Sequence, residues 1–123
     1  MQELVSVVMP AYNAEKYIGK AIQSVLRQIY RNFELIIVDD SSTNKTWEKI
    51  QSYNDSRITA IRHQQNKRVA EARNTALNIA RGKWVALIDA DDVWLPERLE
   101  KLIGILEEKG DDFFYFRRPY FMF

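Results

Sequence analysis

The sequence predicts an α/β protein with a mainly parallel sheet and helices on both faces of that sheet. Short runs rich in β-branched residues alternate with stretches whose apolar residues recur at helical spacing. The strand-like runs are apolar at nearly every position, which is typical of strands that are buried on both sides. With 123 residues, the chain has the length of one domain and can bury a single core.

The first part of the chain predicts one strand followed by one helix. Residues 4–9 (LVSVVM) form a short β-branched run, and we expect Pro10 to end this strand. Apolar residues then recur on one helical face over residues 14–29. Asn13 precedes them and is the expected N-cap of this helix.

The next part of the chain repeats the order of strand and helix. Residues 33–38 (FELIIV) form a second buried run, which two aspartates end. The segment SSTNKT then carries helix-start signals, with Ser42 or Thr43 as the expected cap. The helical spacing continues through Tyr53.

The second half of the chain predicts two more such pairs. Residues 57–62 (RITAIR) alternate and predict a more exposed strand, which is followed by a polar loop with His63, expected to be solvated. An alanine-rich helix is expected over residues 69–80. Residues 83–88 (KWVALI) predict a fourth buried strand, and Pro96 suits the first turn of the last helix.

The end of the chain differs in composition from the rest. Gly110 fits the C′ position of the last helix, and residues 111–123 are dominated by phenylalanine and tyrosine. An apolar end of this kind favours packing on a partner, so we expect self-association through this tail. The alternative is that the tail folds back onto the core.

Composition excludes several classes of function. The net charge of +1 gives no electrostatic case for binding nucleic acid or an anionic membrane. The absence of cysteine excludes disulfides, thiolate metal sites and thiol catalysis. The first residues lack the pattern of a signal peptide, and no apolar run has the length of a membrane span, so we expect neither. We expect a cytoplasmic location, with attachment at the inner face of the membrane as the alternative.

Acidic residues gather where the predicted strands end. In open parallel sheets, the ligand crevice lies beyond the carboxyl ends of the strands. Five acids follow the second and fourth strands, and they are Asp39, Asp40, Asp89, Asp91 and Asp92. Two carboxylates about 4 Å apart repel each other by roughly 1–4 kcal/mol near a protein surface. A hard divalent cation, Mg²⁺ or Mn²⁺, and a diphosphate that it bridges are therefore the expected ligands.

Other side chains near this edge keep two interpretations. Tyr12 follows the first strand and either stacks on a base or caps the core. Arg73, on the third predicted helix, either meets a phosphate or pairs with an acid, and the spacing does not separate the two. Neither GxGxxG nor GxxxxGK(S/T) occurs, which excludes a nicotinamide fingerprint and a P-loop. A phosphoacceptor receiver domain is disfavoured because it needs an acid pair after the first strand.

The sequence resembles the nucleotide-sugar-binding half of family 2 glycosyltransferases, which have the Rossmann-like GT-A fold. The matching segments are VSVVMPAYNAEKYIGKAIQSVLRQIYRNFELIIVDDSST and NKRVAEARNTALNIARGKWVALIDADDVWLPERLEKL. The resemblance covers about Leu4 to Leu106. It implies a nucleotide-sugar-binding domain at residues 1–110, and residues 111–123 would begin an acceptor-binding half.

The resemblance implies an inverting, metal-dependent enzyme that transfers a sugar from a nucleotide-diphosphate sugar, first of all a UDP-sugar, to a saccharide or lipid-linked acceptor of the cell envelope. The implied donor-binding residues are Pro10, Ala11, Tyr12, Asp40, Arg73 and Asp89. The first three would line the nucleoside pocket and Asp40 would contact the base. Asp89 and Asp91 match the D-x-D that contacts ribose and holds Mg²⁺ or Mn²⁺. Asp92 is a further acid there, and the principal metal ligand is left open between Asp91 and Asp92.

The sequence departs from the family pattern in ways that keep other functions in view. Ser41 and Arg68 stand where the family usually has glycine, so their loops are expected to be more restricted and the nucleotide affinity to be weaker. Asn44 replaces a common acid. No candidate for the catalytic base is found, and we expect that base in a missing second half. The alternatives are a non-catalytic interaction module with a degenerate fold and, less favoured, a nucleotidyltransferase.

Overall fold

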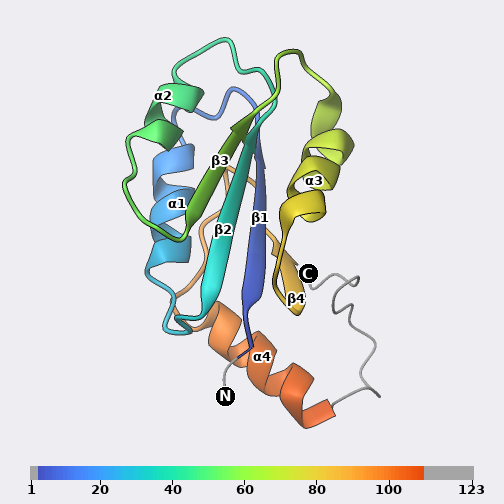
Figure 1. Cartoon of the computed structure of the whole chain (residues 1–123). Coiled ribbons are helices and arrows are strands. Elements are labelled where there is room, and N and C mark those ends of the chain that lie inside the picture. The colour runs from blue at the N-terminus through green and yellow to red at the C-terminus, as the bar shows by residue number, and fades with distance from the viewer. Residues whose placement is uncertain (1–2, 110–123) are drawn as a thin grey trace.

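The computed structural model describes residues 3–109 as an open parallel sheet between helices (Figure 1). The four strands are β1 (Val5–Ala11), β2 (Phe33–Asp39), β3 (Ile58–Arg62) and β4 (Trp84–Leu87). The helices are α1 (Ile18–Leu26), α2 (Thr46–Gln51), α3 (Arg68–Ile79) and α4 (Arg98–Lys109). The strand order is β3-β2-β1-β4 and every pairing is parallel, so the predicted fold class is confirmed.

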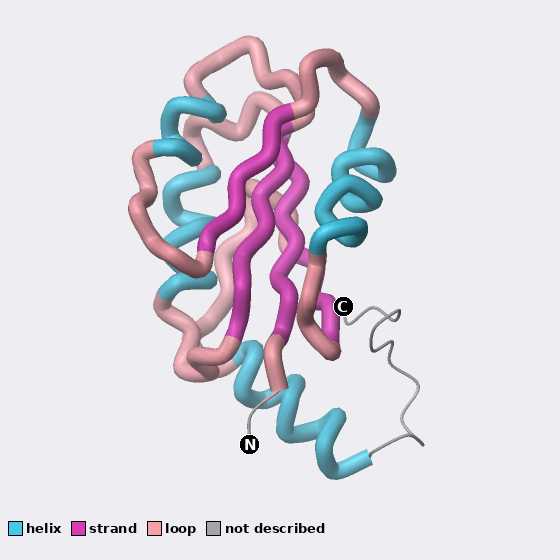
Figure 2. The backbone as a smooth tube through the Cα atoms, viewed as in Figure 1, coloured by secondary structure: helices cyan, strands magenta, loops and turns pink. Residues whose placement is uncertain are grey.

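The sheet is covered on both faces, as the unalternating strands predicted. Alternate residues of β1 face opposite sides. Val7 and Met9 pack into a cluster with residues of α1 and α4, whereas Val8 packs against α3. Ala72 and Ala76 present the small side chains with which α3 approaches the sheet closely. Figure 2 shows α3 on one side of the strands and α1 and α2 on the other.

Pro10 lies inside β1, and the prediction that it ends the strand is wrong. Alternate residues of β1 bond to opposite neighbours. Ala11 accepts a hydrogen bond from Asp40 on the β2 side, and Val8 accepts one from Ile88 on the β4 side. Pro10 therefore faces β4, whose pairing with β1 ends at Val8. The missing N–H of the proline removes no bond from the sheet, so the strand continues.

The predicted helix caps are also wrong. Asn13 does not cap α1, because its side chain turns away and its Oδ1 accepts a hydrogen bond from the N–H of Thr43. In the loop before α2, Ser42 Oγ donates to Asp39 instead of capping a helix. The N-cap of α2 is Lys45, whose side chain makes no capping bond, and the N–H of Thr46 donates to Asn44 Oδ1 just before the helix.

The last helix begins at Arg98, two residues after Pro96, so Pro96 precedes its first turn. It lies at the opposite end of the sheet from the carboxyl ends of the strands (Figure 1). Leu99 and Ile103 bury it against the same core cluster as α1. The expectations for Gly110 and the aromatic tail fall outside the described residues. Between residues 3 and 109, no helix combines the length and the apolar character that crossing a membrane requires.

A buried polar network joins the start of β1 to the turn before β4. Glu34 is buried and accepts hydrogen bonds from Ser6 Oγ at 2.5 Å and from the N–H of Arg81 at 2.7 Å. Ser6 Oγ in turn accepts one from the N–H of Gly82 at 2.8 Å. The backbone of Gly82 therefore lies against β1, where a Cβ would meet Ser6 N at 2.6 Å.

Two glycine substitutions should change stability in opposite directions. Gly82→Ala should lower the free energy of unfolding by about 1–3 kcal/mol, because its methyl group would overlap backbone atoms of Leu4 and Ser6. Gly104→Ala should raise it by about 0.5–1 kcal/mol, because Gly104 lies inside α4 with no neighbour within 4 Å of the added carbon. Urea unfolding of both variants checks this pair. Equal stabilities would contradict the close approach at Gly82.

Candidate functional site: a cavity at the carboxyl ends of the strands

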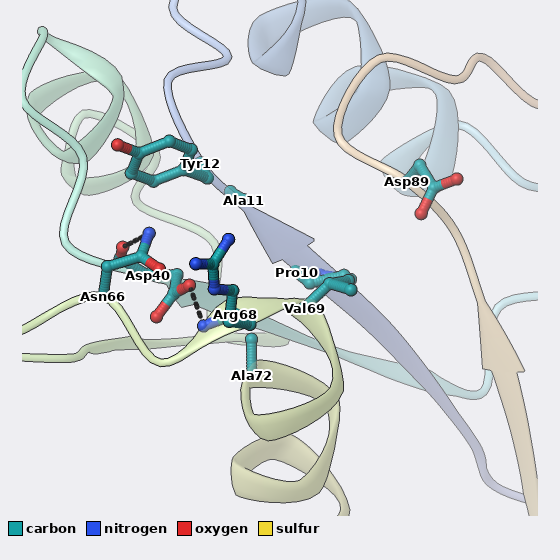
Figure 3. Close-up of a pocket in the computed structure, with 9 residues that line it drawn as sticks. All are labelled: Pro10, Ala11, Tyr12, Asp40, Asn66, Arg68, Val69, Ala72 and Asp89. Carbon is teal, nitrogen blue, oxygen red and sulfur yellow. Dashed lines mark hydrogen bonds between the residues drawn. The ribbon is translucent and has the colours of Figure 1, made fainter.

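A cavity of about 260 Å³ opens where β1 and β2 end and α3 begins (Figure 3). Its lining comes from three strand ends and from α3 with the loop before it. The lining residues are Pro10, Ala11, Tyr12, Asp40, Asn66, Arg68, Val69, Ala72 and Asp89. Five of the predicted donor-binding residues thus share one cavity, because the parallel strands bring their carboxyl ends to one edge.

Asp40 joins the end of β2 to the start of α3. Its Oδ2 accepts a hydrogen bond from the N–H of Arg68 at 2.8 Å, and its Oδ1 accepts one from the N–H of Lys67 at 2.8 Å. The N-cap residue Lys67 makes no side-chain capping bond. Asp40, which follows β2, instead accepts the hydrogen bonds of the N–H groups at the start of α3. A negative charge at a helix N-terminus is also favoured by the helix dipole.

His63 gives Asp40 a further partner. The imidazole is buried, with Nδ1 2.9 Å from Asp40 Oδ1 and Nε2 2.8 Å from Thr75 Oγ1. Because a carboxylate only accepts, Nδ1 is the donor to Asp40. The prediction of a solvated histidine is therefore wrong. The chain turns back across the strand ends after β3 and encloses the ring between Asp40 and α3.

These contacts set the ionisation of Asp40. Burial alone would raise the pKa of this carboxyl group. The hydrogen bonds from His63 and from the N–H groups of Lys67 and Arg68 outweigh burial and hold the pKa of Asp40 below its ordinary value. The carboxylate is thus charged at neutral pH at the back of the cavity.

Asp39 does not belong to the cavity, although it precedes Asp40. It is fully buried, and its carboxylate accepts hydrogen bonds from Ser42 Oγ at 2.5 Å and from the N–H of Ser42 at 3.2 Å. Arg62 Nε lies 3.3 Å from Asp39 Oδ2, the oxygen that also accepts the N–H of Ser42. Asp39 therefore stabilises the turn after β2. The five acids thus do not form one cluster: Asp39 lies in this turn, Asp40 lines the cavity, and the other three lie at the end of β4.

The remaining three acids converge at the end of β4. The N–H of Asp92 donates to the carbonyl oxygen of Asp89 at 3.0 Å, which folds this segment into a turn. One carboxylate oxygen from each of Asp89, Asp91 and Asp92 lies within 4.8 Å of the others, and all three residues are exposed. The spacing and the oxygen chemistry fit one hard divalent cation.

Arg73 reaches this acidic cluster from α3. Its Nη2 lies 3.5 Å from Asp89 Oδ1, so it pairs with an acid, one of the two interpretations left open above. Its Nε is buried without a hydrogen bond within residues 3–109. Asp91 lines a second cavity of about 270 Å³, and Tyr12, half exposed, borders both cavities.

The two positions that lack the usual glycine carry the backbone conformation that glycine favours. Ser41 has a φ of 63° and Arg68 has a φ of 78°. A side chain in this left-handed region costs roughly 1–2 kcal/mol. Ser41 follows Asp40 in the chain, and the N–H of Arg68 donates to Asp40, so both loops next to Asp40 hold strain. This strain gives a physical basis to the restriction expected for these loops.

Sequence reasoning missed Asn66, and it named Arg68 only as a replacement of the usual glycine, without expecting its side chain to line the cavity. Asn66 donates from Nδ2 to the carbonyl oxygen of Asp40 at 3.2 Å, and Arg68 lies at the first turn of α3. Both follow the third strand, whose end meets the same edge as the ends of the other strands. Applying the rule of parallel strand ends to β3 would have included this loop.

An open parallel sheet with a cavity at the carboxyl ends of its strands defines the class of open α/β domains that bind their ligands at this edge. Within that class, the chain belongs to glycosyl transferase family 2, whose family model matches residues 6–122. It is 43% identical over 112 residues to UDP-Glc:alpha-D-GlcNAc-diphosphoundecaprenol beta-1,3-glucosyltransferase WfgD of Escherichia coli. That match covers 91% of this chain and 44% of the relative, so the chain spans less than half the length of that enzyme.

Solved structures agree with this assignment. Staphylococcus aureus TarS residues 1–349 in complex with UDP-GlcNAc has a TM-score of 0.80 and 32% identity, over 85% of this chain and 31% of that one. The mannosyltransferase PcManGT of Pyrobaculum calidifontis, in complex with GDP-Man and Mn²⁺, has a TM-score of 0.77 and 28% identity, over 83% and 32%. The fold and the family are thus established together.

Replacing Asp40 tests its role in the fold as a function of pH. Asp40→Asn should lower the free energy of unfolding at pH 7 by about 1–3 kcal/mol, because the amide group cannot accept all the hydrogen bonds of the carboxylate. Since the pKa of Asp40 is lowered by folding, its stabilisation is present above pH about 4 and is lost as the pH falls through the folded-state value. The difference between the two proteins should therefore shrink towards pH 3.

Urea unfolding at pH 7, 5 and 3 measures this effect. Asp92→Asn is the matched control, because it removes the same charge from an exposed site and should change stability little. A difference for Asp40→Asn that stayed constant down to pH 3 would contradict the role of the charged form.

Proposed function

We propose that residues 3–109 form the donor-binding part of a glycosyltransferase that transfers a sugar from a nucleotide-diphosphate sugar to a saccharide or lipid-linked acceptor. The observation that carries this proposal is the single cavity lined by both the charged Asp40 and Asp89, because Asp89 belongs to the acidic cluster with Asp91 and Asp92. WfgD is named for a UDP-Glc donor and a diphosphoundecaprenol acceptor, which supports a UDP-sugar and a lipid-linked acceptor here. A lipid-linked acceptor would bring the protein to a membrane surface.

The shape of the cavity suggests how the nucleoside would lie. Pro10 and Ala11 form an apolar floor, and Tyr12 presents an exposed ring on which a base can stack. The carboxylate of Asp40 accepts three hydrogen bonds from the protein and has capacity for about one more. The ring N–H of a uracil or guanine base suits that remaining position.

The acidic cluster fits the metal that this donor would bring. The three exposed carboxylates lie within 4.8 Å of each other and therefore repel. Within the described residues, Arg73 forms an ion pair with Asp89 and with neither of the other two acids. We assign Mg²⁺ or Mn²⁺ to Asp91 and Asp92, with Asp89 directed to the ribose and the metal. When bound, such an ion stabilises the charge that develops on the departing nucleoside diphosphate. Arg73 would lie beside that diphosphate.

Transfer with inversion also needs a base that deprotonates the acceptor hydroxyl on the face opposite the diphosphate. Among residues 3–109, the acids at the strand ends already have structural or donor-binding assignments. The WfgD match spans less than half of that enzyme, and we assign the base and the acceptor site to a second half of this kind. Residues 1–110 would then be the donor domain, and the aromatic tail would begin the second half.

A second candidate function is a non-catalytic interaction module. Ser41 and Arg68 favour it, because both hold strained backbone beside Asp40 where glycine would be relaxed. In this case the cavity would no longer bind a nucleotide, and the aromatic tail would be the surface that contacts a partner.

Calorimetric titration of UDP, GDP, dTDP and CDP, with and without Mn²⁺, separates the two functions. We expect one nucleotide, first of all UDP, to bind in a metal-dependent manner, and Asp91→Asn to weaken it at least tenfold by removing a metal ligand. Glu100→Gln removes the same charge from the exposed face of α4, at the far end of the sheet, and should have no effect.

The outcomes of this titration are distinct. Absence of binding by all four nucleotides would contradict the donor site and favour the interaction module. Binding that did not depend on Mn²⁺ or on Asp91 would keep a nucleotide site but remove the metal from the proposal.

A further inference from the structure

Arg68 places a free cation in the cavity. It is the first residue of α3, and Figure 3 shows its guanidinium pointing from the helix towards Tyr12 and Ala11. No hydrogen bond or ion pair engages this guanidinium within residues 3–109, although its backbone N–H is bonded to Asp40. A guanidinium carries five N–H donors in a fixed plane, so several donors face the cavity without a protein acceptor.

These donors lie beside an acceptor. The N–H of Arg68 is 2.8 Å from Asp40 Oδ2, so the side chain of Arg68 starts next to the carboxylate. Asp40 Oδ1 already accepts from His63 and Lys67, whereas Oδ2 accepts from Arg68 alone among the described residues. The wall of the cavity therefore offers one free acceptor position next to a set of free donors.

The other end of the cavity has its own cation. Arg73, further along α3, lies 3.5 Å from Asp89, where the acidic cluster begins. Figure 3 shows Arg68 on the side of Asp40, with Asp89 apart from them at the end of β4. The two arginines of α3 thus lie in different places: Arg73 pairs with Asp89 at one end of the cavity without lining it, whereas Arg68 lines the part next to Asp40.

We propose that Arg68 is a specificity-determining residue that donates hydrogen bonds to a carbonyl oxygen of the nucleobase, beside the base N–H that Asp40 accepts. This inference rests on the proposed function, which supplies the nucleotide. Uracil fits the pair because its ring N–H lies between two carbonyl groups. A carbonyl oxygen is therefore adjacent to the N–H on whichever side the guanidinium approaches.

Binding of uridine and of UDP, measured with Arg68→Gln in the presence of Mn²⁺, tests the proposal. Uridine lacks phosphates, so a contact with the base should weaken both ligands by a similar factor, which we expect to be about tenfold. This loss should change little between low and high salt, because the acceptor on the base is neutral. Competition against UDP measures the weaker affinity of uridine, and circular dichroism confirms that the variant is folded.

Lys67→Gln is the matched control. Lys67 also donates its backbone N–H to Asp40 at 2.8 Å, but its side chain does not line the cavity. It removes the same charge one residue away and should change either affinity less than twofold. Arg68→Lys, which keeps the charge and loses the planar group, should fall between the wild type and Arg68→Gln.

Three results would overturn the proposal. A loss confined to UDP and reduced by salt would place Arg68 on the phosphates instead. Equal losses for Arg68→Gln and Lys67→Gln would mean that only the overall charge matters. If Arg68→Gln bound both ligands as the wild type does, Arg68 would make no contact with the nucleotide. The proposed function would still hold in that case, because the wild type binds UDP. Failure of the wild type to bind UDP would overturn the proposed function itself, and this inference with it.

Discussion

The hydrogen bonds accepted by Asp40 hold the candidate site together. They satisfy the backbone N–H groups of Lys67 and Arg68, which the start of α3 would otherwise leave unpaired, and they fix the imidazole of His63. One carboxylate thereby connects β2, the loop after β3 and α3. The position of Arg68 in the cavity, and the approach of Asn66 to the same strand end, both depend on this connection.

The parallel direction of the strands then gives the cavity its length. β1 is central, and β2 and β4 pair with it on opposite sides. Neighbouring strands are about 4.8 Å apart, so the ends of β2 and β4 are on the order of 10 Å from each other. Asp40 and Asp89 follow these two ends, with Pro10 and Ala11 of β1 between them. An extended ligand with a polar group at each end, such as a nucleoside diphosphate, matches this arrangement.

Much of this could be predicted from the sequence, because local patterns determine it. Three apolar runs and one alternating run predicted the four strands, and the rule of strand ends predicted that Asp40 and Asp89 lie at the same edge of the sheet. Pro10 was misjudged because its place in a strand depends on where the pairing of β4 stops. The burial of His63 depends on how a polar loop returns across the sheet, and such a loop carries no hydrophobic periodicity. Contacts that depend on register or on the return of a loop are not encoded in neighbouring residues.

The backbone strain of the described chain is gathered around the cavity. Between residues 3 and 109, the non-glycine residues with positive φ are Asn13 after β1, Ser41 after β2 and Arg68 at the start of α3. Selection of random variants for heat resistance should enrich substitutions at these positions, because a residue that tolerates positive φ there would raise stability. Each gain would alter a loop that shapes the cavity. Selection for heat resistance and selection for ligand binding would therefore favour different residues at the same few positions.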